Sequence, residues 1–193
     1  YINGDISTPD TSIQYPSGDL IKFYHGLEPR LSLRWLLPDN SSIKAGYSYN
    51  YQYVHLTALS AVSLPTDIWY PTTDIARPQI GWQGSVGYFK NFFDDMMETS
   101  VEVYYKKMNN MIEYMEGALP GDNVNDNTDN LLVFGEGWSY GVELFVKKAM
   151  GHFTGWIGYT WAKSDRLFSD LNSGNMYPAK YDRRHDLSIV GTY

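Results

Sequence analysis

Hydrophobic and polar residues alternate along much of this chain. The clearest run extends from Ile43 to Tyr53, where a tyrosine falls on every second residue from 47 to 53 and Ser, Asn and Gln fill the positions between. Successive side chains of a β-strand point to opposite faces, so this run predicts a strand with one aromatic face and one polar face. About ten such residues are also what a tilted strand needs to cross a bilayer. The aromatic face therefore contacts either a protein core or lipid.

The same alternation recurs in other parts of the chain. Seven segments follow it, at 30–37, 42–54, 80–89, 97–108, 137–147, 152–163 and 185–193. A helical period is weak everywhere except near 96–111, where a Val-Glu-Val-Tyr-Tyr core favours a strand instead. We therefore predict an all-β protein built from about seven antiparallel up-and-down strands.

The links between these segments fall into two length classes that alternate along the chain. Short links at 38–41, 90–96 and 148–151 are separated by long links at 55–79, 109–131 and 164–184. Outer-membrane barrels have short periplasmic turns and long extracellular loops, whereas soluble sandwiches seldom sort their links in this way. The pattern predicts strands of a transmembrane β-barrel, in which the aromatic and aliphatic faces would contact lipid.

Composition narrows the functional classes. Aromatic residues make up 16% of the 193 residues and charged residues 19%, with a net charge of −7. This acidic balance argues against a nucleic-acid partner, which usually requires a basic face. The chain has no cysteine, so it can form neither disulfides nor a thiolate metal site. No apolar run approaches the roughly 18 residues of a transmembrane helix.

One motif carries a catalytic alternative. Gly137-Trp138-Ser139-Tyr140-Gly141 matches the nucleophile elbow of hydrolases, and Asp182 and His185 follow it in the order of a triad. That elbow requires a strand, a sharp turn and then a helix. Here the alternation continues unbroken through Ser139, so we expect no enzyme. The four histidines show no ligand spacing, and we expect neither a metal nor a cofactor.

Several segments together resemble the barrel of TonB-dependent outer-membrane receptors, most closely those of the Bacteroidetes type. They are GLEPRLSLRW at 26–35, SLPTDIWYPTT at 63–73, SVEVYYKKMNNMIEY at 100–114, SYGVELFVKK at 139–148, GWIGYTWAKSDRLF at 155–168 and YDRRHDLSIVGTY at 181–193. The resemblance implies a barrel of roughly 22 strands with a plugged lumen. Residues 1–193 would then be one part of the C-terminal half of the barrel, without the plug domain or a signal peptide.

The resemblance also implies a function and partners. It implies energy-coupled uptake of a scarce nutrient across the Gram-negative outer membrane, with TonB acting through the plug domain. Outer-membrane lipid and the nutrient would be partners, and a surface lipoprotein is a further candidate. Siderophore, cobalamin, glycan and peptide remain open as the nutrient. A passive porin or structural outer-membrane barrel is one alternative, and a soluble β-sandwich binding module is another.

Candidate ligand contacts fall in two places. Trp69 and Tyr70 form the most aromatic part of a long link, and 121–130 is the polar tip of another. The polar strand faces would line the lumen and carry the remaining candidates, which are Arg34, Lys44, Gln52, Glu98 and Glu102. Among the basic residues of these faces, Arg34, Lys44 and Lys106 can pair with carboxylates across strands.

A charged cluster precedes the last predicted strand. It consists of Asp182, Arg183, Arg184 and His185. We expect a structural role for it, with Arg183 and Arg184 pairing with inner-face carboxylates at the start of the strand.

Overall fold

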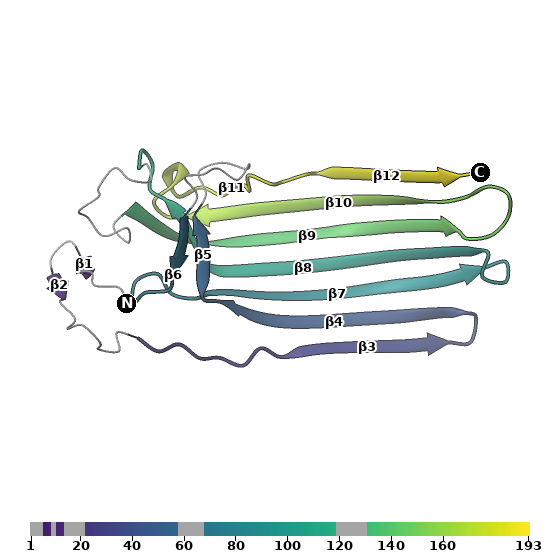
Figure 1. Ribbon diagram of the computed structural model, residues 1–193, viewed down its shortest axis with the longest axis horizontal. Helices are drawn as coiled ribbons and strands as arrows, with labels where there is room; N and C mark the ends of the chain where they lie inside the picture. Colours follow the sequence, from purple (N-terminus) through teal and green to yellow (C-terminus); the bar gives the residue numbers. More distant parts are fainter. Residues whose placement is uncertain (1–5, 9–10, 14–21, 58–67, 119–130) are drawn as a thin grey trace.

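The computed structural model describes residues 6–8, 11–13, 22–57, 68–118 and 131–193. Within them, one antiparallel sheet of eight strands follows the chain up and down (Figure 1). Its long strands are β3 (Arg30–Leu37), β4 (Ser41–Gln52), β7 (Gln79–Phe92), β8 (Met97–Tyr114), β9 (Leu132–Lys148), β10 (Thr154–Phe168) and β12 (His185–Thr192). The short strand β11 (Tyr177–Pro178) pairs with β10 beyond the end of β12. The predicted all-β class and the seven predicted strands are confirmed.

The two length classes of links are also confirmed, and each class lies at one end of the sheet. Short turns join β3 to β4, β7 to β8 and β9 to β10 at the right of Figure 1. At the other end lie β11 and a separate hairpin of β5 (Val54–Thr57) and β6 (Ile68–Pro71). The 3-10 turn η2 (Asn172–Gly174) belongs to the last long link, and β1 (Ile6–Thr8) pairs with β2 (Thr11–Ile13) near the N-terminus.

Some predicted boundaries were wrong. Strand β8 continues to Tyr114, so the predicted link at 109–131 started too early. Strand β9 begins at Leu132, five residues before the predicted strand at 137–147. The predicted link at 55–79 contains most of the β5–β6 hairpin. Within the described residues, β3 pairs only with β4 and β12 only with β10. The sheet therefore has two free edges and does not close.

The register places apolar side chains of neighbouring strands opposite each other on one face, which we call the outer face. Val86 lies opposite Val103, and Val103 lies opposite Val142. Val101, Val103 and Ile157 are 46%, 47% and 48% exposed. A soluble monomer rarely exposes so broad an apolar surface, whereas a lipid-facing strand surface has this composition.

An aromatic row crosses the outer face from β4 to β10. Its neighbouring rings lie close together, with centroid distances of 6.5 Å from Tyr47 to Trp82, 5.4 Å from Trp82 to Tyr105, 6.3 Å from Tyr105 to Tyr140 and 6.2 Å from Tyr140 to Trp161. Tyrosine and tryptophan gather where a membrane meets water. The aromatic row therefore indicates one boundary of the membrane.

The outer face becomes charged immediately beyond the aromatic row. Lys107 pairs with Glu136 at 3.0 Å, and Lys163 pairs with Asp165 at 2.8 Å, both on the side of the long links. From Tyr105 back to Met97 at the short turns, eight residue steps span roughly 26 Å at ~3.3 Å per residue. This length matches the apolar band of about 25 Å in outer-membrane barrels. Strands β8, β9 and β10 extend past that band on the long-link side.

The extended ends of these three strands carry the hydrophobic core of the described residues. Met111, Val133, Phe168 and Leu171 are buried there, and Phe168 is fully enclosed. Arg166 forms an ion pair with Glu113, whose other carboxylate oxygen accepts a 3.1 Å hydrogen bond from the Tyr177 hydroxyl. Burial and the Glu113 charge raise the pKa of Tyr177 to about 12. We call this part, residues 111–114, 132–135 and 166–178, the cap.

A β-bulge in β8 sets the orientation of the cap. Met108 lies opposite Gly137 but Met111 lies opposite Gly135, so β8 has one extra residue relative to β9. Asn110 adopts a left-handed conformation with φ 55°, which asparagine tolerates, and its Nδ2 donates a 3.0 Å hydrogen bond to the Pro78 carbonyl. Because of the extra residue, Met111 shares the face opposite the aromatic row, where Phe168 lies.

Candidate functional site on the inner face of the sheet

The face opposite the aromatic row, which we call the inner face, is polar. Along one line across the strands, Lys44 lies opposite Gly87, Gly87 opposite Glu102 and Glu102 opposite Glu143. The register brings all the inner-face candidates onto this surface, namely Arg34, Lys44, Gln52, Glu98 and Glu102. Their contact with a ligand stays a prediction.

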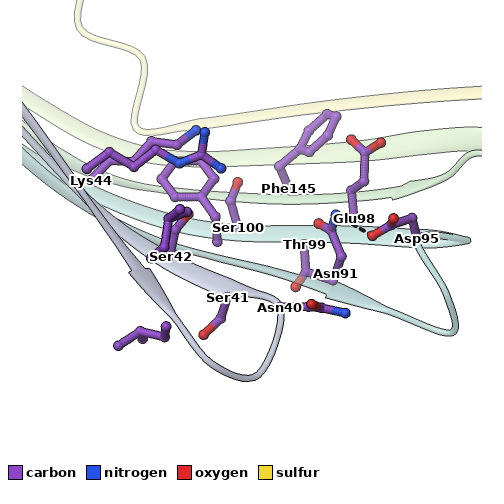
Figure 2. Close-up of a pocket in the computed structure, with 14 residues that line it drawn as sticks. Asn40, Ser41, Ser42, Lys44, Asn91, Asp95, Glu98, Thr99, Ser100 and Phe145 are labelled. Atoms are coloured by element: carbon purple, nitrogen blue, oxygen red, sulfur yellow. Dashed lines mark hydrogen bonds between the residues drawn. The ribbon is translucent and has the colours of Figure 1, made fainter.

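One hollow of this face lies near the short turns and has a volume of about 650 Å³. Figure 2 shows Lys44, Glu98 and Phe145 around it, contributed by three different strands. Glu98 pairs with Lys147 at 3.2 Å, and Asn91 donates a 2.8 Å hydrogen bond to Asp95 (Figure 2). The charges of this lower region are thus partly compensated within the sheet.

The expected pairing of the basic residues was wrong. Lys44 Nζ lies 3.8 Å from the centroid of the Phe89 ring, a cation–π contact. Among the described residues, neither Arg34 nor Lys106 forms an ion pair with a carboxylate. For Lys44, the physical reason is Gly87, which lies between Lys44 and Glu102 across the strands: a Cβ on Gly87 would lie 2.8 Å from Phe89 Cε2 and 3.1 Å from Glu102 Oε2. Without that Cβ, the Phe89 ring lies along the backbone, and Lys44 contacts it.

Two facing carboxylates form the most unusual electrostatic feature. Glu102 and Glu143 occupy opposed positions on β8 and β9 and line a hollow of about 320 Å³ with Phe89 and Phe145. In the part of the chain that the structure describes, neither forms an ion pair. Like charges at opposed positions destabilise a sheet, so this pair requires a compensating cation or water on the lumen side. Glu143 was not among the candidates from the sequence, because alternation predicts the face on which a residue lies but not which residue lies opposite it on the next strand.

A third hollow lies between the aromatic row and the long links. It measures about 250 Å³, and its polar lining consists of Ser48, Asn50, Gln52, Gln79, Gln83 and Lys106. Arg30 donates a 3.0 Å hydrogen bond to Asn50 Oδ1, and Gln52 donates one of 2.8 Å to the Val54 carbonyl. Amide groups dominate this upper hollow, in contrast to the charged lower region.

The aromatic loop candidates lie away from these hollows. Trp69 and Tyr70 belong to β6, opposite Leu56 and His55 in the hairpin. Trp69 is 67% exposed, whereas His55 is buried and its burial lowers its pKa. The 121–130 segment lies outside the described residues. A ligand role for either loop stays a prediction.

The 182–185 cluster connects β12 to β10. Asp182 Oδ1 accepts a 2.8 Å hydrogen bond from the Ser164 amide, and Arg184 pairs with Asp182 at 3.0 Å. Arg183 lies 3.8 Å from Asp186, and the His185 ring nitrogen lies 2.7 Å from the Tyr159 hydroxyl. These contacts are compatible with the structural role that we predict.

The structure does not support a nucleophile elbow at Ser139. Ser139 lies in the middle of β9, which continues as a strand to Lys148, so no turn or helix follows it. The described residues hold no group of three or more His, Asp or Glu side chains arranged for a metal. They also contain no helix that is long and apolar enough to cross a membrane.

Comparison with known proteins agrees with this geometry. A family model described as "TonB dependent receptor-like, beta-barrel" matches residues 5–193, almost the whole chain. A search of curated proteins found no match.

Proposed function

Because the chain belongs to the TonB-dependent receptor β-barrel family, we propose that it forms part of an energy-coupled nutrient importer of the Bacteroidetes type. Barrels of this family are outer-membrane proteins, and the family consists of receptors and transporters rather than enzymes. In the proposed importer, a plug domain fills the lumen beside the inner face. TonB pulls on that plug to release the bound nutrient, using energy from the inner membrane.

The facing pair of Glu102 and Glu143 is the observation that carries this proposal. Two opposed carboxylates on a lumen wall favour a partner that brings positive charge to them. A folded domain inside the lumen can supply a fixed arginine or lysine side chain there. Charge-assisted hydrogen bonds of this kind are stronger than neutral ones, so they would help to hold the plug in the lumen.

The outer face supports the membrane part of the proposal. Its apolar band, the aromatic row and the charged pairs beyond that row follow the order expected from lipid to water. The described residues form one long-stranded sheet and two short hairpins, and this arrangement supports a membrane barrel over a soluble sandwich of two sheets. A passive porin remains the alternative, since water in an open lumen also solvates the two carboxylates.

Conductance of the full-length receptor in planar bilayers tests the proposal. We expect the wild-type receptor to stay closed, and the double variant Glu102→Gln, Glu143→Gln to open at lower urea concentration because its plug is held less tightly. Glu98→Gln is the matched control, since Glu98 already pairs with Lys147. A wild-type protein that conducts steadily without urea would instead identify a porin.

A further inference from the structure

The upper hollow has the chemistry of a ligand site. Its amide and hydroxyl groups come from two neighbouring strands at matched heights, with Gln52 opposite Gln79 and Ser48 opposite Gln83. Each carboxamide offers both donors and an acceptor, so four such groups can bind a ligand with many hydroxyls. Gln52 and Gln83 are exposed to the lumen side rather than packed in a core.

One cation lies at the edge of this hollow. Lys106 lies opposite Gln83, and its Cε lies 4.0 Å from the position that a Cβ on Gly81 would occupy. Its stem therefore crosses Gly81, which lies opposite Asn50. Within the described ranges no carboxylate pairs with Lys106, whereas Arg30 already contacts Asn50 and Glu28. The hollow thus offers a single uncompensated positive charge.

This combination argues against several ligand classes. A multiply charged metal chelate requires several cations, and a corrinoid or an apolar peptide requires extended apolar walls. The upper hollow offers neither several cations nor extended apolar walls. Most of its lining is amide and hydroxyl groups with one ammonium group, and its other lining residues are Met108, Trp82, Tyr51 and Gly81. A hydroxyl-rich ligand with an acidic substituent matches it in both respects.

We propose that the upper hollow binds an acidic oligosaccharide, with Lys106 facing a carboxylate and the surrounding amides hydrogen-bonding its hydroxyls. This inference rests on the proposed import function and names its substrate class. The hollow lies on the long-link side of the facing pair Glu102 and Glu143, so an incoming ligand reaches it first. Those two carboxylates would repel the ligand, which keeps its acidic group near Lys106.

Binding to the full-length receptor in detergent tests the substrate class. The probes are oligosaccharides of galacturonate, mannuronate and glucuronate, each as the free acid and as its methyl ester, which removes the charge and keeps the sugar. We expect at least one free acid to bind more tightly than its ester, with an affinity that falls as KCl is raised. Lys106→Met should weaken that binding roughly tenfold to a hundredfold and leave the ester unchanged.

Lys107→Met is the matched control, because Lys107 is the next residue on the opposite face and pairs with Glu136. Lys106→Arg should retain the preference for the free acid. The inference is overturned if no acidic oligosaccharide binds, if Lys106→Met and Lys107→Met behave alike, or if a ferric chelate binds instead. Since the conductance experiment needs no ligand, each of these results leaves the proposed import function to be judged separately.

Discussion

Strand β8 passes through two environments that stabilise it in different ways. In its lower half Val101 and Val103 are 46% and 47% exposed on the outer face, whereas Met111 in its upper half is 7% exposed within the cap. The lower half has its backbone paired on both sides, while its outer-face side chains stay exposed, as expected for a surface that contacts lipid. The upper half packs its side chains against protein. One continuous sheet therefore combines an exposed apolar band with a small core that packs within the protein.

A substitution of the same type is therefore expected to affect stability differently at the two ends of β8. In the membrane band, apolar volume can vary because lipid adapts to it, but a charge is costly. In the cap, an ion pair is accommodated because Arg166, Glu113 and Tyr177 satisfy each other. There a lost ring leaves an empty space that the protein cannot readily refill.

Truncation of the cap core should have the largest effect. Phe168→Ala removes the fully enclosed ring and should lower the free energy of cap opening by about 3–5 kcal/mol. Hydrogen exchange of the amides at 111–114 and 132–135 in the full-length receptor measures this change. Phe153→Ala, at a 58% exposed ring near a short turn, is the control and should leave those amides unchanged. Equal protection in both variants would show that the cap core does not stabilise the sheet ends.

A charge in the membrane band should have the next largest effect. Val101→Arg places a guanidinium on the outer face midway between the aromatic row and the short turns, and should cost about 2–4 kcal/mol of folding free energy in bilayers. Ser100→Arg, one residue away on the inner face, should cost far less because the lumen is wet. Urea titration of refolding into lipid vesicles compares the two. A similar loss in both variants would contradict the assignment of the faces.

High pH should weaken the cap by a smaller amount. The pKa of Tyr177 is raised to about 12 in the folded state, so above its unfolded value of about 10 the unfolded state releases the proton first. The contribution of Tyr177 to the free energy of cap opening is therefore fully present below about pH 10, and it falls as the pH rises towards 12. Tyr177→Phe should cost about 1 kcal/mol at neutral pH and remove this decline. Exchange rates of the cap amides between pH 8 and 11, corrected for the intrinsic rate, measure it.

Alternation was sufficient to predict the strands where one face meets lipid and the other meets water. The tyrosines from 47 to 53 sit on β4 as predicted up to Gln52, where the strand ends. The prediction failed at Met108, because the bulge at Asn109 and Asn110 interrupts the period of two while the strand continues to Tyr114. A period cannot distinguish a bulge from the end of a strand.

For the inner face, the sequence predicted which residues lie on it but not which of them contact one another. Alternation places Glu102 and Glu143 on polar faces. That they lie opposite each other depends on the register of β8 against β9, which cannot be derived from the sequence of either strand alone. Lys44 was expected to meet a carboxylate, and the absence of a side chain at Gly87 directs it to the Phe89 ring instead. Side-chain contacts of this kind depend on three neighbouring strands, so they cannot be predicted from the sequence of one segment.

The bulge at Asn110 also determines where related chains can change length. Residues beyond it follow the opposite parity to those before it, so a regular strand that kept both Asn109 and Asn110 would exchange Glu113 with Ile112 and direct the cap's carboxylate away from Arg166. Insertions between Glu116 and Leu131 would only lengthen a link. We therefore expect the family's variation in loop size to accumulate past Tyr114, where a change of length leaves the faces of β8 unchanged.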